Sequence, residues 1–175
     1  MLDTIDEARS SSRLPSGKST EIANRLQLAI LEHRIPPGAN LSEDEVGEIF
    51  KTSRTVVRSA LQSLAHTGLV TMKRNRGAFV AQPTISDAHE VFEVRALVEP
   101  EGARRAAKFI TKTQLSALQA QIEAEHDAVS SGEKGRALAL SGAFHISIAE
   151  AARHSIYSTL VRSLIAQSSL IIALY

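Results

Sequence analysis

The amino-acid sequence predicts a mainly helical protein built in two parts. Aromatic residues make up only 4% of the chain and Trp is absent, so its cores must be built from Leu, Ile, Val and Ala, a composition that favours helices. Residues 20–82 carry three helical patterns and then two short strand patterns, whereas residues 88–175 carry helical patterns alone. We expect a disordered tail at 1–19 and a linker at 83–87, because both are polar and rich in Ser, Thr or Pro.

Three helices are predicted in the first part. The first runs from about Thr20 to His33 and is stopped by "IPPGAN". The second begins at Ser42, whose pairing with Glu45 predicts a capping box, and ends near residue 50. The third runs from about Ser53 to residue 66, with Gly68 in the position of a left-handed C-cap. Its predicted buried stripe consists of Val57, Ala60, Leu61 and Leu64.

A β-hairpin is predicted to follow these helices. The strands "LVTMK" and "AFVA" flank "RNRG", whose Asn and Gly tolerate the positive φ of a tight turn. Three helices with a short corner at Lys51–Thr52, followed by a hairpin, predict a winged helix-turn-helix.

The second part is predicted to be an antiparallel all-helical domain with helices over about 87–109, 113–130, 136–152 and 155–175. Pro100 lies inside the first of these, so we expect a kink or a break there. The apolar ending "LIAQSSLIIALY" needs cover, either from a partner protein or from helices beyond Tyr175. We expect the latter, in a chain truncated at its C-terminus.

Charge is concentrated in the first part. No acid lies between Glu48 and Asp87, and the six basic residues of that window are Lys51, Arg54, Arg58, Lys73, Arg74 and Arg76. Arg54 and Arg58 stand one helical turn apart at the start of the third helix, beside Ser53 and Thr55 rather than beside acids. A pair of arginines on one helix is usually solvated surface, but this pair belongs to a wider basic pattern.

This pattern predicts DNA binding. A helix fits the major groove, arginine can fork onto guanine O6 and N7, and hydroxyls and first-turn N–H groups suit phosphates. The candidate DNA-binding residues are Ser53, Arg54, Thr55 and Arg58 on the helix, and Arg74, Arg76 and Gly77 at the hairpin tip.

The first part resembles the DNA-binding domain of GntR-family bacterial transcription regulators. The resemblance lies in "PPGANLSE", "SRTVVRSALQSLAHTGLV" and "RGAFVA". Residues 86–175 resemble the all-helical FCD-like ligand-binding domain of the FadR-type branch, through "FEVRALVEPEGARRAA" and "FHISIAEAARHSIYSTLVRSL". The chain departs from the family at Asp44, where a phosphate-gripping basic residue is usual, and at Val56 and Ser59, where Pro and Glu are usual.

The resemblance implies a cytoplasmic, dimeric repressor or activator. Its helical domains would pair two winged domains on a pseudo-palindromic operator in double-stranded DNA, and a small organic acid such as a sugar acid would alter the pairing. Arg95, Ser141 and His145 are the implied effector-binding candidates. Arg95 fits two interpretations, a grip on an effector carboxylate and an ion pair with Glu99.

His145 matches the first histidine of the divalent-metal site found in many relatives, and it equally suits a core histidine. Four residues earlier stands Ser141, a poor metal ligand. A zinc-type site would therefore need further histidines from a longer chain.

Other classes of function fit the sequence less well. With no cysteine, disulfides and thiolate metal sites are excluded. There is no glycine-rich phosphate loop and no nucleophile with a base, so we expect no enzyme. No run of 18 apolar residues is present, so we expect no membrane partner. The main alternative is a protein-interaction module that uses an exposed helix at Leu164–Tyr175, with the basic patch incidental.

Overall fold

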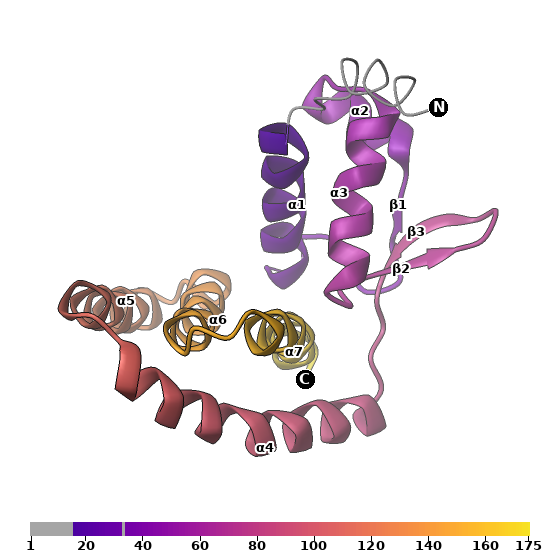
Figure 1. The fold of residues 1–175 in the computed structure, drawn as a ribbon. Helices are drawn as coiled ribbons and strands as arrows, with labels where there is room; N and C mark the ends of the chain where they lie inside the picture. Colours follow the sequence, from indigo (N-terminus) through magenta and orange to yellow (C-terminus); the bar gives the residue numbers. More distant parts are fainter. Residues whose placement is uncertain (1–15, 33) are drawn as a thin grey trace, which may run out of the picture.

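A computed structural model describes residues 16–32 and 34–175. The winged part contains α1 (Ser16–Leu31), β1 (Asn40–Leu41), α2 (Glu43–Phe50), α3 (Arg54–His66), β2 (Val70–Lys73) and β3 (Gly77–Val80). The helical part contains α4 (Ile85–Phe109), α5 (Lys112–Ser130), α6 (Lys134–Ala151) and α7 (Ser155–Leu174). In Figure 1 the winged part stands above α5, α6 and α7, and α4 runs along the side of α6 and α7 that faces away from it.

The predicted fold class is confirmed, with differences at the edges of the elements. The first helix begins at Ser16, four residues before the predicted start at Thr20. The rest of the predicted tail, like His33, lies outside the described residues. The predicted linker at 83–87 is largely the first turn of α4, which begins at Ile85. There Thr84 caps the helix, because its hydroxyl accepts from the Asp87 N–H while the Asp87 carboxylate accepts from the Thr84 N–H at 2.7 Å.

One strand was missed. Two-residue β1 pairs antiparallel with β3, which gives a three-stranded sheet in the order β1-β3-β2. Only Leu41 of β1 is buried, and two residues are too few to show an alternating pattern.

Of the kink or break expected at Pro100, the break does not occur, since α4 continues through it as one helix, which is curved (Figure 1). Proline removes the hydrogen bond to the carbonyl four residues earlier, which belongs to Ala96. Both residues are exposed, so water can satisfy that carbonyl.

The corner between α2 and α3 holds the third helix in place as predicted. Lys51 takes a left-handed conformation at φ 48°. At the start of α2, Ser42 accepts from the Glu45 N–H at 3.4 Å, which is one of the two bonds of the predicted capping box. At the far end of α3, Gly68 at φ 80° makes a Schellman turn, in which the Leu69 N–H donates to the Leu64 carbonyl at 3.1 Å. The predicted stripe of α3 is fully buried.

The last helix joins the two parts. Ala166 and Leu170 of α7 lie in the same apolar core as Ile22 of α1 and Leu61 of α3. On another side of α7, Leu164 and Ile171 pack with Val91 of α4, while Val161 and Ile165 pack with Ala149 of α6. The winged part therefore shares its core with the helical part.

By length and composition α7 could cross a membrane, because 18 of its residues reach a mean hydropathy of 1.3. The absence of an uninterrupted apolar run does not exclude this, because a membrane-spanning helix can contain single polar residues. In the structure the packing of α7 against the winged part, α4 and α6 explains its apolar composition.

We predict that Leu170→Ala lowers the free energy of unfolding by about 2–5 kcal/mol, because it opens a cavity in the shared core. Leu170 is 2% exposed, whereas Ile172 on the same helix is 53% exposed and provides the control. Urea denaturation should show a change within about 0.5 kcal/mol for Ile172→Ala. Equal losses in the two variants would contradict the shared core.

Candidate nucleic-acid interface and helical-domain pocket

The first turn of α3 lies at the surface. Ser53 is the N-cap residue, and its side chain accepts no hydrogen bond from the first-turn N–H groups. Thr55 beside it is exposed. The side chains of Arg54 and Arg58 are 72% and 61% exposed. The four candidate residues predicted on this helix are thus all exposed, and Arg54 and Arg58 lie one turn apart on one face.

The two arginines have acidic partners that the sequence analysis missed. Arg58 donates from Nε and Nη2 to the two carboxylate oxygens of Glu43 at 2.7 and 2.9 Å. Arg54 donates from Nη2 to Asp44 at 2.9 Å, and its Nε contacts the other oxygen of the same carboxylate. The expectation that hydroxyls alone surround this pair is therefore wrong, because packing of α2 on α3 brings in acids from ten and fifteen residues earlier.

Pairing changes the electrostatics of this surface. The hydrogen bonds and charge of Arg58 hold the pKa of the Glu43 carboxyl below its ordinary value, so this carboxylate is ionised at neutral pH. The same contacts raise the pKa of Arg58. Two of the six basic residues of the acid-free window are consequently compensated by α2, and the local charge is smaller than the sequence predicted.

The hairpin tip is the second basic surface. Arg74 and Arg76 are exposed in the turn between β2 and β3, where Asn75 at φ 58° and Gly77 at φ 89° provide the predicted positive angles. Figure 1 shows the hairpin projecting away from the helices. Lys73 lies over the Phe79 ring at 4.7 Å, which fixes one more cation beside the tip.

In the helical part the structure joins Arg95 and His145 through Glu99. Arg95 donates from Nε to Glu99 at 2.5 Å, and His145 Nδ1 lies 2.8 Å from the other oxygen of the same carboxylate. Arg95 also donates from Nη1 to Ser168 of α7 at 2.7 Å. The ion-pair interpretation of Arg95 is thus present in the structure, and Ser168 is a partner that sequence reasoning missed because it lies 73 residues away.

This network borders a surface depression of about 350 Å³, lined by Phe92, Arg95, Ala96, Glu99 and Pro100. Tyr157 lies close by, and burial, helped by the Glu99 charge, raises the pKa of its hydroxyl. Ser141 is half-buried on α6, one turn before His145. A small acid at Arg95 would have to displace Glu99 from a guanidinium group that is 14% exposed.

The same residues do not suit a metal ion. Arg95 stands beside Glu99, the carboxylate that contacts His145, so a cation there would face a fixed positive charge. Across residues 16–32 and 34–175 the structure has no group of three or more His, Asp or Glu side chains arranged to hold a metal.

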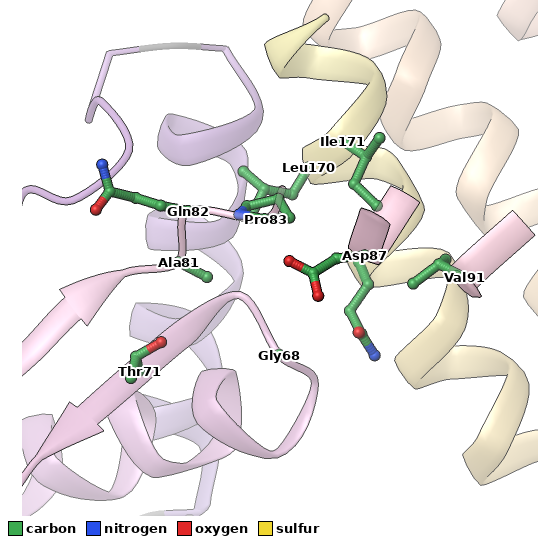
Figure 2. Close-up of a pocket in the computed structure, with 10 residues that line it drawn as sticks. Gly68, Thr71, Ala81, Gln82, Pro83, Asp87, Val91, Leu170 and Ile171 are labelled. Carbon is green, nitrogen blue, oxygen red and sulfur yellow. The ribbon is translucent and has the colours of Figure 1, made fainter. Parts of the chain in front are cut away.

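A further pocket of about 240 Å³ lies between the two parts of the chain. In Figure 2 Asp87 of α4 faces the turn at Gly68, and Leu170 and Ile171 of α7 lie opposite Ala81 and Pro83. Gln167 of α7 approaches the turn so closely that a Cβ atom at Gly68 would lie 2.7 Å from Gln167 Cγ. The end of α3 therefore rests directly on α7.

Comparison with known proteins follows the division of the fold. Residues 18–80 match the family described as bacterial regulatory proteins of the gntR family, and residues 90–175 match the FCD domain. The transcriptional repressor RspR of Escherichia coli K12 is 31% identical over 125 residues, which are 71% of this chain and 55% of that protein. The galactonate operon transcriptional repressor of the same strain is 33% identical over an alignment of 127 positions, and this match covers 60% of this chain and 55% of that protein.

The chain thus spans about 55% of the length of these relatives, which are transcriptional repressors and not enzymes. Among solved structures, a GntR protein from Rhodococcus sp. RHA1 is 26% identical with a TM-score of 0.73, covering 91% of this chain and 76% of that one. Escherichia coli McbR/YncC, at 20% identity and a TM-score of 0.74 over 86% of this chain and 71% of its own, shares the fold.

We predict that the carboxyl of Glu43 titrates below 4.5, its ordinary value, and that Arg58→Ala moves the midpoint upwards. The pKa is lowered in the folded state, so the pair contributes stability above about pH 4.5, and this contribution is lost as the pH falls through the folded pKa. NMR titration of the side-chain carboxyls measures both midpoints.

Asp87 provides the control for this titration. The N–H and hydroxyl of Thr84 lower the pKa of Asp87, and Arg58 takes no part in that cap, so its midpoint should stay the same in the variant. An unchanged Glu43 midpoint in Arg58→Ala would show that the ion pair does not form in solution.

Proposed function

Because the chain belongs to the GntR family of bacterial regulatory proteins, we propose that it binds an operator in double-stranded DNA and that a small organic acid modulates this binding. We propose further that it acts in the cytoplasm as a homodimer on a pseudo-palindromic site. The observation that carries the proposal is the exposed first turn of α3, where Arg54 and Arg58 present their guanidinium groups on one face.

The geometry of the winged part supports DNA binding. A helix N-terminus offers free N–H groups to phosphates, and Ser53 and Thr55 add hydroxyls there. Arginines one turn apart at this end of a helix can reach base edges in the major groove. Arg74 and Arg76 on the projecting hairpin suit the phosphate backbone or the minor groove.

The helical part supports a small acid as the effector. Arg95 carries a fixed guanidinium at the edge of a depression of about 350 Å³, where Glu99 and His145 add hydrogen-bonding groups. A carboxylate that binds Arg95 would compete with Glu99 and Ser168 for its donors. Sugar acids provide such a carboxylate together with hydroxyls for the other groups.

The path from this site to the DNA-binding helix is short. Ser168 of α7 accepts from Arg95, the preceding Gln167 touches the Gly68 turn, and Leu170 enters the core of the winged part. A ligand that takes Arg95 from Ser168 would therefore act on the helix that supports the end of α3. We propose that this contact has a second arrangement, in which Arg95 no longer holds Ser168, and that the effector favours one of the two.

Exposed apolar side chains support pairing of helical domains. The large apolar residues of α4 and α5 that are more than a third exposed include Phe92, Val94, Leu97, Leu115, Ile122 and Val129. Burying them would be favourable, and a symmetric dimer is the usual way. The alternative of an interaction module that uses Leu164–Tyr175 has lost its premise, since Leu164, Leu170 and Ile171 are buried inside the chain.

We predict that Arg58→Ala weakens operator binding by about 1–3 kcal/mol and relaxes base preference, because it removes a donor fork from the reading face. Fluorescence anisotropy with the DNA upstream of the protein's own gene, against a scrambled duplex at several salt concentrations, measures both effects. Arg104→Ala is the matched control, since Arg104 is an equally exposed arginine, 65% accessible and paired with Glu101, in the helical part. Operator and scrambled affinities equal to wild type in Arg58→Ala would refute the assignment.

We predict that one or more sugar acids raise the midpoint of thermal unfolding of the wild type and not of Arg95→Gln. A ligand at 100 times its Kd stabilises the folded state by about 2.7 kcal/mol. The panel should include galactonate, because one relative is a galactonate operon repressor. Arg104→Gln should respond as the wild type does, and an undiminished response in Arg95→Gln would place the effector elsewhere.

A further inference from the structure

Arg54 and Arg58 are both held through the same edge of the guanidinium group. Arg58 uses Nε and Nη2 for Glu43, and Arg54 uses Nε and Nη2 for Asp44. This leaves Nη1 and the second hydrogen of Nη2, two parallel donors at the tip of each side chain. A pair of parallel donors is what guanine O6 and N7 accept in the major groove.

The carboxylates also change what these arginines can bind well. The ion pair of a guanidinium and a carboxylate has no net charge, so it attracts a phosphate much less than a free arginine does. A guanine edge is neutral and depends on donor geometry instead. Pairing thus lowers the attraction to phosphate, a contact that carries no sequence information. It keeps the contact with the guanine edge, which does carry sequence information.

We propose that Glu43 and Asp44 are specificity-determining residues that hold Arg58 and Arg54 from one side so that their free edges read guanine. This rests on the proposed function as a DNA-binding regulator. The carboxylates also hold each side chain in one orientation before DNA arrives, which lowers the entropy lost when the base contact forms.

The two carboxylates differ in how firmly they act. Glu43 is 22% exposed and forms both bonds to Arg58 with normal lengths, whereas Asp44 is 57% exposed. An exposed ion pair is weaker because water competes for it. Loss of Glu43 should therefore reduce discrimination more than loss of Asp44.

The test is selection of binding duplexes from a random-sequence library by the wild type, Glu43→Gln and Asp44→Asn. Glu45→Gln is the matched control, because it removes the same charge from the same turn of α2, and its carboxylate is paired with neither arginine in the described part of the chain. The best duplex is then compared with copies carrying adenine in place of each guanine, and with a scrambled duplex, across salt concentrations.

We expect Glu43→Gln to lose about fivefold or more of the preference for guanine over adenine at one position, the lower end of what a bidentate base contact provides. Affinity for the scrambled duplex should stay the same or rise. The slope of the logarithm of this affinity against the logarithm of salt concentration should steepen by about one, because one more arginine becomes free for phosphate. Arg58→Lys, which keeps the charge and lacks the fork, should lose the same preference. Melting temperatures that fall only slightly, as the loss of one exposed ion pair requires, separate these effects from misfolding.

Wild-type discrimination in both Glu43→Gln and Asp44→Asn would overturn the inference and leave DNA reading intact. An equal loss in Glu45→Gln would also overturn it, because net charge and not contact would then be responsible. A wild type that selects no sequence would instead refute the proposed function itself.

Discussion

The insertion of α7 beneath the winged part is the contact on which the rest of the arrangement depends. Ala166 and Leu170 complete a core that α1 and α3 leave open on one side, and the same helix packs against α4 and α6. Because α7 packs in the cores of both parts, the winged part is not joined to the helical part by its linker alone. The connection between β3 and α4 is also short, since it consists of Ala81–Thr84. Arg95 of the candidate effector site and the end of α3 thereby contact neighbouring residues of α7, Ser168 and Gln167.

Acidic residues in the first turn of α2 serve this fold in more than one way. They lie at the positive end of the helix dipole, where carboxylates stabilise a helix of only eight residues. Two of them also cross to α3 and fix its arginines. A sequence rule that assigns such acids to helix capping is therefore correct and incomplete, because the same side chains face a second helix.

Much of the fold could be predicted because its signals are local. Helix caps, the Gly68 turn and the Asn75–Gly77 hairpin depend on residues within a few positions of one another, and the family motifs lie in these segments. The misses depend on contacts between distant segments. Arg54 and Arg58 looked unpaired because their partners belong to another helix, and Ser168 could not be linked to Arg95 by spacing. Pro100 was expected to kink or break α4, and the helix continues without a break because the freed carbonyl is exposed to water.

The placement of α7 has a consequence for folding during synthesis on the ribosome. Ile22 and Leu170 belong to one core, although nearly the whole described chain lies between them. A ribosome delivers the N-terminal part first, at about 5–20 residues per second. Until α7 emerges, the winged part carries the apolar patch that Ala166 and Leu170 later cover, so it leaves the ribosome with an unfinished core. A fragment that ends before this helix would keep Arg54 and Arg58 and lack the core residues that support α3, so we expect it to fold poorly.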